Sequence, residues 1–218
     1  MLKCCSNPVL CVAVHGGSGV SFGVIEQLRQ ARPGARMLEL VHRLDRETSG
    51  VLLVAKKRSA LTRLQDQFRD RETGKTYLAL VHGQWPSNKK VIDLPLQRYL
   101  IPNGVGEGER RVRIAAKDDA NAQRAITLVR VSRLVGDYSL LEVTIKTGRT
   151  HQIRVHLASL NHPLLGDTLY GGRTLPPARR QMLHARRLSF VDPANGDTVS
   201  CEAPLPDDMN AVLDAIVW

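Results

Sequence analysis

The chain has 218 residues, 43% of them hydrophobic, which is enough to build a sizeable core. Lys and Arg number 31 against 21 Asp and Glu, a net charge of +10, and this excess favours a polyanionic partner. A membrane protein is not expected, because the sequence has neither an apolar span nor a basic amphipathic helix.

The cysteines and histidines predict no metal site. The four cysteines stand at positions 4, 5, 11 and 201, without a C-x-x-C spacing. We therefore expect reduced thiols in a cytoplasmic protein. His151 and His156 are five residues apart and would not face one another on a helix, so a two-His metal site is not expected.

The first part of the chain is predicted to form a helix and two strands. The helix is capped by Ser21 and ends before Pro33. A strand over Met37–Val41 follows. The apolar run Val51–Ala55, entered through a Gly turn, is typical of a buried strand.

Asp45 lies in the loop before this buried strand, between Arg43 and Arg46. The two guanidiniums favour the ionised carboxylate, which makes Asp45 a poor general acid at neutral pH. Such a residue suits a nucleophile or an electrostatic anchor. The alternative is a surface Asp in a local ion pair.

A helix capped by Ser59 is predicted next, with Leu61, Leu64 and Phe68 facing the core. Its other face carries Arg63, Gln67 and Arg71, and is either solvated or in contact with the polyanionic partner. The following strand, Gly74–Val81, contains Tyr77. By pattern alone, Tyr77 is a half-buried sheet residue.

The polar segment Arg98–Ala122 predicts a mobile hairpin with a glycine-rich tip and the basic arm Glu109–Arg113. It is either a solvated loop or a flexible contact for phosphates. Two antiparallel strands, Ala125–Arg133 and Tyr138–Ile145, are then expected across the turn Gly136-Asp137.

A helix capped by Thr150 is predicted over His151–Leu160, with Ile153 facing the core. Arg149 precedes its N-terminus, where backbone N–H groups favour anions. A strand over Met182–Phe190, a hairpin turn at Asn195-Gly196 and a last helix within Asp207–Trp218 complete the chain.

Three segments together resemble the RluA family of RNA pseudouridine synthases. They are HRLDRETSG, KTYLALVHG and GRTHQIRVHLASLNHPLLGD, in the order of the family. The resemblance covers about Val12 to Pro206, and His15–Arg29 is most similar to the branch that modifies large-subunit ribosomal RNA. It implies an α+β fold, with a bent, largely antiparallel mixed sheet, flanking helices and an active cleft across the sheet.

The resemblance also implies roles for single residues. Asp45 would be the catalytic nucleophile and Arg149 the partner of its carboxylate. Tyr77 would be the active-site tyrosine, whose ring stacks on the flipped base and whose hydroxyl could assist proton removal. Four further residues are expected to contact the substrate, namely Arg43, His42, Ile153 and Leu183. Arg43 would fill the place of the flipped nucleotide, and Leu183 would help to line the pocket.

By the same resemblance, residues 1–218 form a single catalytic domain. The small RNA-binding domain that precedes the core in this branch is not encoded here, and Met1–Cys11 departs from the family pattern. The expected substrate is large-subunit ribosomal RNA, bound by a cytoplasmic monomer. The reaction is a rearrangement, so no metal or small-molecule cofactor is expected.

Three alternatives remain from the sequence. One is a synthase that acts on tRNA or another RNA. Another is a non-catalytic RNA-binding module, which the low aromatic content of 4% and the lack of an RRM or KH signature disfavour. The last is a glycosidase, which normally needs two carboxylates, whereas Asp45 alone stands out.

Overall fold

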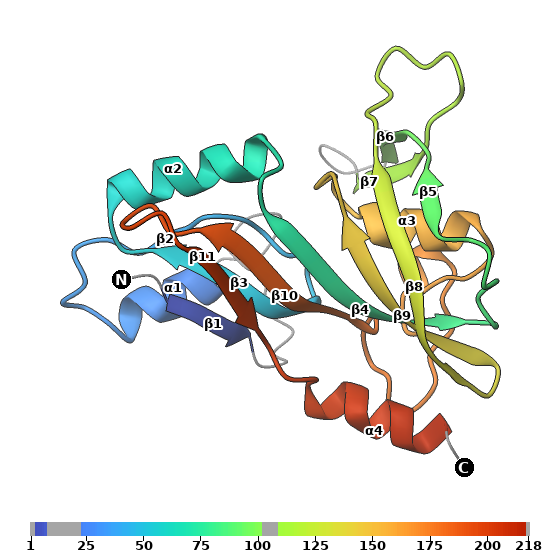
Figure 1. Cartoon of the computed structure of the whole chain (residues 1–218). Helices are drawn as coiled ribbons and strands as arrows, with labels where there is room; N and C mark the ends of the chain where they lie inside the picture. Colours follow the sequence, from blue (N-terminus) through green and yellow to red (C-terminus); the bar gives the residue numbers. More distant parts are fainter. Residues whose placement is uncertain (1–2, 8–22, 102–108, 217–218) are drawn as a thin grey trace. The chain divides into compact units, whose positions relative to one another are not determined.

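The computed structural model describes residues 3–7, 23–101 and 109–216, and they form two compact units. The first unit contains the described residues up to Leu78 together with Leu183–Asp214. The second contains the described residues of Ala79–Met182 and those from Ala215 onward. Figure 1 labels the helices and strands of both.

The first unit is built on a mixed sheet with two helices. Its strands are β1 (Lys3–Asn7), β2 (Glu39–Leu40), β3 (Ser49–Ala55), the start of β4 (Gly74–His82), β10 (Leu183–Val191) and β11 (Thr198–Glu202). Its helices are α1 (Val24–Gln30), α2 (Arg58–Arg69) and most of α4 (Asp207–Ile216). The β3 strand runs antiparallel to β1 and β2 and parallel to β10, which pairs antiparallel with β11.

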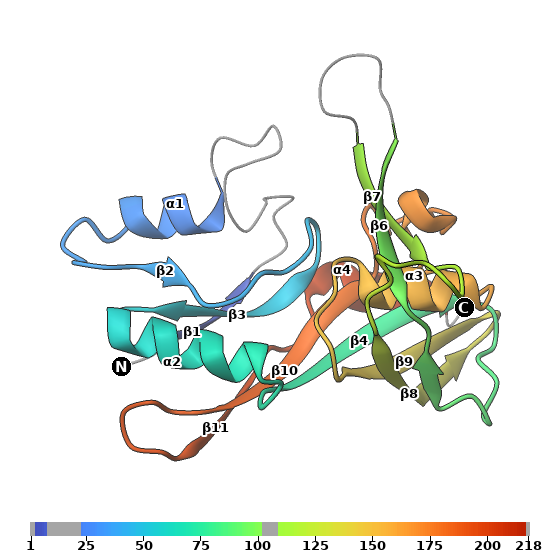
Figure 2. The same ribbon diagram turned by 90° about the horizontal axis from the view of Figure 1, so that it is seen from above.

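The core of the first unit lies on both faces of β3, all seven residues of which are buried. Val51 and Leu53 pack with Leu61 and Leu64 of α2 in one cluster. Val54 packs with Ile25 of α1 in another. Because neighbouring strand residues point to opposite faces, α1 and α2 cover opposite faces of β3, as Figure 2 shows.

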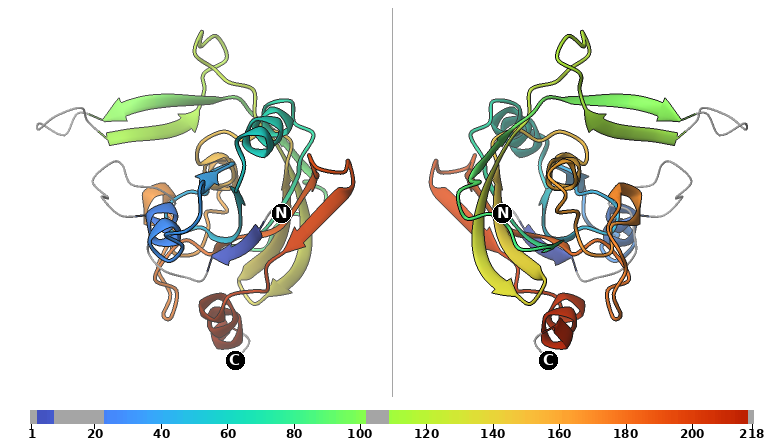
Figure 3. Two further views of the ribbon diagram at one scale, coloured as in Figure 1. Left: turned by 90° about the vertical axis from the view of Figure 1, so that its left-hand side faces the viewer. Right: turned by 90° about the vertical axis from the view of Figure 1, so that its right-hand side faces the viewer.

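The second unit combines an antiparallel sheet with a two-stranded hairpin and one α-helix of eight residues. Its remaining elements are β5 (Val91–Asp93), β6 (Leu96–Ile101), β7 (Glu109–Ile114), β8 (Ile126–Val135), β9 (Tyr138–Ile145), α3 (Gln152–Ser159) and the 3-10 turn η1 (Thr168–Tyr170). The sheet order is β4-β9-β8-β5. The β6–β7 pair forms a separate arm, visible in Figure 3.

The predicted α+β class and the mostly antiparallel sheet are confirmed. The expected bend of the sheet and the cleft across it stay predictions. Within the described part of the chain, no helix is long and apolar enough to cross a membrane. The two predicted strands around Gly136 are β8 and β9, and the predicted basic hairpin is β6–β7, whose tip at 102–108 lies outside the described residues.

Several local expectations were wrong. The N-cap of α2 is Lys57 rather than Ser59, and the N-cap of α3 is His151 rather than Thr150. The strand expected over Met37–Val41 is only the two-residue β2. The expected cap Ser21 lies outside the described residues.

The thiol prediction also fails, because Cys201 on β11 is disulfide-bonded. Sequence spacing identifies local cysteine motifs, but it does not reveal which distant cysteines a fold brings together. The cysteine pattern therefore gives no support to a cytoplasmic assignment.

Candidate functional site

The loop that carries Asp45 is anchored to β3 at its start and closed by a turn. The Val41 N–H donates to the Leu53 carbonyl at 3.0 Å, and the Leu53 N–H donates to His42 Nε2 at 3.1 Å. Further along, the Thr48 N–H donates to the Asp45 carbonyl at 3.0 Å. The half-buried Asp45 is therefore presented from a fixed turn beside a rigid strand.

His42 supports this loop through both its ring face and its ring nitrogen. Its ring stacks on Phe68, with centroids 4.9 Å apart and planes 13° from parallel. Burial lowers the pKa of His42 to about 4, so the ring is neutral at pH 7 and Nε2 accepts the Leu53 hydrogen bond. These contacts favour a structural role, and the expected substrate contact of His42 stays a prediction.

The end of the loop approaches β10 very closely. Gly50, with φ +119°, pairs with Ala185, and a Cβ at this position would lie 2.2 Å from the Ala185 carbonyl oxygen. Only glycine fits there. Ser49 Oγ lies 2.9 Å from His184 Nδ1, so the loop end is tied to the strand that begins with the buried Leu183.

Tyr77 on β4 lies close to the Asp45 loop, because the cluster it packs against includes Leu44 of that loop. It packs against the buried cluster of Leu44, Leu52 and Ala185. Burial raises the pKa of Tyr77 above its usual range, and the charge of Asp45 raises it further. The structure thus brings Tyr77 within electrostatic range of Asp45, while Arg43 is exposed.

Arg149, in the second unit, is held by the buried side chain of Gln152. Gln152 Oε1 accepts from the Arg149 N–H at 3.1 Å and from Thr147 Oγ1 at 2.7 Å. Gln152 Nε2 donates to the Ile126 carbonyl and to Thr127 Oγ1, both at 3.0 Å. All four hydrogen-bonding positions of the amide are used, which fixes the turn that presents Arg149.

The first residue of this helix region is conformationally unusual. His151, the N-cap of α3, has φ +52° and lies in the left-handed region. Its Nδ1 lies 2.7 Å from the hydroxyl of Tyr170. The Tyr170 ring in turn lies 5.0 Å from the guanidinium of Arg154, which forms a buried bidentate pair with Asp167 at 2.7 Å. This network stabilises the turn before α3.

The predicted site residues fall into two sets. The first unit holds Asp45, Tyr77, Leu183, Arg43 and His42, and the second holds Arg149 and the buried Ile153. The pairing of Asp45 with Arg149 therefore stays a prediction.

Sequence reasoning missed two residues. Gln152 stands three residues after Arg149 within GRTHQ, the spacing at which a Gln side chain accepts a backbone N–H in a capping box, but Arg149 is not one of the Ser or Thr residues that mark such a box. Lys75 precedes Tyr77 within KTY, and it is buried although lysines are almost never found there. The expectation that Gln67 is solvated was wrong: its amide exchanges two hydrogen bonds with the Val191 backbone.

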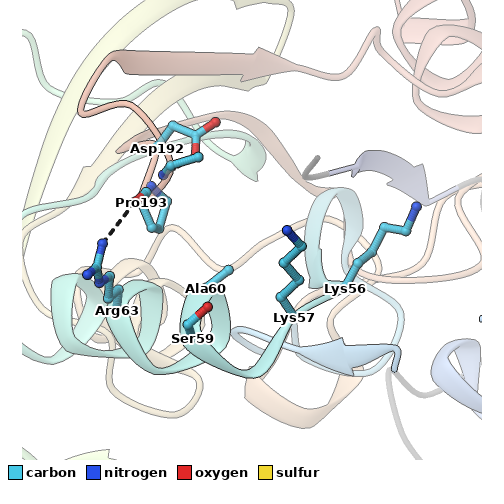
Figure 4. A pocket seen from close by; sticks show the side chains of 8 residues that line it. Lys56, Lys57, Ser59, Ala60, Arg63, Asp192 and Pro193 are labelled. Carbon is cyan, nitrogen blue, oxygen red and sulfur yellow. Dashed lines mark hydrogen bonds between the residues drawn. The ribbon is translucent and has the colours of Figure 1, made fainter. Parts of the chain in front are cut away.

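A separate pocket of about 210 Å³ lies at the start of α2 and is drawn in Figure 4. It is lined by Lys56, Lys57, Ser59, Ala60, Arg63, Asp192, Pro193 and Ala194. Arg63 closes one side by donating to the Pro193 carbonyl at 3.0 Å. None of the predicted site residues lines this pocket.

Curated proteins resemble the chain over most of its length. It is 46% identical to the ribosomal large subunit pseudouridine synthase C of Pasteurella multocida over 211 residues, which are 94% of this chain and 62% of that protein. The protein of the same name from Escherichia coli K12 is 44% identical over 212 residues, 94% of this chain and 64% of that one. The chain thus spans just under two thirds of the length of these relatives.

Solved structures resemble the chain as well. The human RNA pseudouridylate synthase domain containing 4 superposes with a TM-score of 0.77 at 26% identity, covering 99% of this chain and 89% of that chain. The human RNA pseudouridylate synthase domain containing 1 gives 0.72 at 29% identity, covering 96% and 82%. Residues 12–159 match the RNA pseudouridylate synthase family. The chain belongs to that family.

Proposed function

We propose that the protein isomerises uridine to pseudouridine in large-subunit ribosomal RNA. The observation that carries this is Asp45, fixed in its turn beside Tyr77, within a chain of this family. The choice of RNA is supported by the name shared by relatives that are 44–46% identical.

The reaction needs bond rearrangement without redox change. The C1′–N1 bond breaks, uracil turns, and C1′ is joined to C5. N1 gains a proton and C5 loses one, so the product has the same formula as the substrate. This balance supports catalysis without a metal or a small-molecule cofactor.

Asp45 is proposed to act as the nucleophile, either at C1′ or by promoting a glycal intermediate. A carboxylate held in a fixed turn is suited to this role because little reorganisation is needed. Arg149 would pair with the carboxylate and orient it. Arg43, exposed on the same loop, would occupy the place of the nucleotide that is flipped out for reaction.

Tyr77 is proposed to stack on the flipped uracil. Burial and the nearby Asp45 both raise its pKa, so the phenol is neutral at pH 7. A neutral phenol is a weak proton acceptor, which favours stacking and hydrogen-bond donation over removal of the C5 proton. Leu183 and Ile153 would add apolar lining to the same pocket.

The cellular setting is part of the proposal. Large-subunit ribosomal RNA as substrate supports work in the cytoplasm, and a rearrangement within one substrate needs no second catalytic subunit, which supports a monomer. We further propose that residues 1–218 act as a single catalytic domain, since the resemblance to the family extends from about Val12 to Pro206.

Nucleoside analysis of an unmodified large-subunit ribosomal RNA transcript after incubation with the purified protein tests the function. The proposal predicts pseudouridine in place of uridine at defined positions. Unchanged RNA would indicate a binding module, and an abasic site would indicate a glycosidase. Pseudouridine formed in a tRNA transcript but not in the ribosomal transcript would move the proposal to another RNA.

A further inference from the structure

Lys75 on β4 is a largely buried lysine, and no carboxylate among the described residues pairs with it. Only 8% of the residue is exposed. Its Nζ lies over the ring of Phe68, 5.4 Å from the centroid. Across the described residues, no hydrogen bond or ion pair involves this ammonium group.

The charged neighbours of Lys75 make it less favourable to bury its positive charge. Burial lowers the pKa of Lys75, and the positive charge of Arg71 lowers it further. In the other direction, the charge of Lys75 contributes to the lowered pKa of His42. A buried charge that faces a like charge and lacks a partner is unfavourable, and an apolar side chain of similar length would stabilise the fold. Stability alone therefore does not account for a lysine here.

The position of Lys75 connects it to the proposed reaction site. It precedes Tyr77 by two residues on β4. Its neighbour His42 lies three residues before Asp45 on the loop. The ammonium thus lies at the start of the loop that carries Asp45.

We propose that Lys75 binds a backbone phosphate of the RNA beside the target nucleotide. The inference rests on the proposed function and adds a binding residue to it. Lysine binds phosphate as a compact point charge. RNA supplies one negative charge per nucleotide, which would offset both Lys75 and the exposed Arg71. The backbone turn at Arg71 is defined by its left-handed φ of +65° and by the Glu72 N–H, which donates to the Gln67 carbonyl at 2.9 Å.

The test compares Lys75→Met with Lys75→Arg and with a control, Lys89→Met, whose side chain is exposed in the second unit. Each variant is titrated with a short oligouridylate and with the unmodified ribosomal transcript over a range of salt. For the oligouridylate, Lys75→Met should reduce the slope of log affinity against log salt by about 0.7, the value for one phosphate contact on a single strand. Affinity at low salt should fall about 5- to 10-fold, and Lys75→Arg should recover most of it.

Chemical unfolding of the same variants separates binding from folding. Lys75→Met should be at least as stable as the parent, since it removes a desolvated charge. An unchanged slope and affinity in folded Lys75→Met would overturn the proposal. So would an equal loss in Lys89→Met, which would assign the effect to net charge. Nucleoside analysis of the parent reports on the proposed reaction separately, so failure of one inference is distinguishable from failure of the other.

Discussion

His42 and Phe68 join the Asp45 loop to the end of α2 by a near-parallel ring stack, with centroids 4.9 Å apart. On the Phe68 ring also lies Lys75 of β4. The Asp45 loop, the end of α2 and the start of β4 therefore meet at one phenyl ring. The stack holds His42 where its Nε2 accepts the Leu53 N–H, and so fixes the start of the loop.

The neutral state of His42 predicts a loss of stability in acid. Its pKa is about 4 in the fold against 6.5 for the free side chain, so the unfolded chain binds more protons between these values. The stabilisation from this group is complete above pH 6.5 and declines as the pH falls to 4, by at most about 3 kcal/mol.

The contribution of His42 to the free energy of unfolding is measured by urea unfolding at several pH values. His42→Gln keeps an acceptor for the Leu53 N–H but does not titrate. The difference between the parent and His42→Gln should therefore change across pH 4–6.5. A difference that stays constant over this range would show that His42 does not carry the effect.

The four hydrogen bonds of the Gln152 amide predict a large loss of stability when this side chain is replaced. Gln152→Leu leaves the Arg149 N–H and the Thr147 hydroxyl without their acceptor, and should lower the free energy of unfolding by about 2–4 kcal/mol. The control is Gln84→Leu, which removes one long, exposed hydrogen bond to Gly136 and should cost less than about 0.5 kcal/mol. An equal change in the free energy of unfolding in the two variants would contradict a stabilising role for the Gln152 amide.

The buried ion pair of Arg154 and Asp167 predicts that the effects of replacing the two residues on the free energy of unfolding are not additive. Asp167→Ala leaves a guanidinium that is 8% exposed without its carboxylate, and should cost about 3–5 kcal/mol. The double variant Arg154→Met with Asp167→Ala should be more stable than Asp167→Ala alone. Unfolding of both single variants and the double variant measures the coupling. The exposed pair Arg29–Glu39 is the reference, since Glu39→Gln should cost at most about 1 kcal/mol.

The β6–β7 arm gives a test of the basic hairpin. If it docks on RNA, replacing Arg110, Arg111 and Arg113 together by Gln should flatten the salt dependence of binding by about 0.7–0.9 per lost phosphate contact. An unchanged slope would show that the arm stays in solvent and does not contact RNA phosphates. Arg179→Gln, on an exposed residue outside the arm, is the matched control.

Much of the fold followed from hydrophobic patterns. The buried run at Val51–Ala55 is β3, and alternation around Gly136 correctly predicted β8 and β9. Helix starts were less predictable, because neither Ser59 nor Thr150 provides the cap. The turn before α3 is instead closed by Gln152, whose side chain accepts the N–H three residues back, as the Gln of a capping box does, but without the Ser or Thr that would mark such a box in the sequence.

The site was predicted mainly through motif resemblance. The pattern around Asp45 placed it correctly before a buried strand, but composition and spacing did not separate a nucleophile from a surface ion pair. Lys75 was missed, and Gln67 was wrongly expected to be solvated, for a common reason. Polar residues are expected at the surface, and only tertiary packing shows that these two are buried.

The most direct test of the account is pseudouridine formation by purified Asp45→Asn under single-turnover conditions. The amide neither attacks C1′ nor carries the developing charge, so product should fall below detection while the fold and RNA affinity are retained. Asp45→Glu should fail almost as completely, because an added methylene moves the oxygen beyond the tolerance of a preorganised site, about 0.5 Å. Activity of Asp45→Asn within about tenfold of the parent, a loss of only ~1.4 kcal/mol of transition-state stabilisation, would contradict the proposed mechanism.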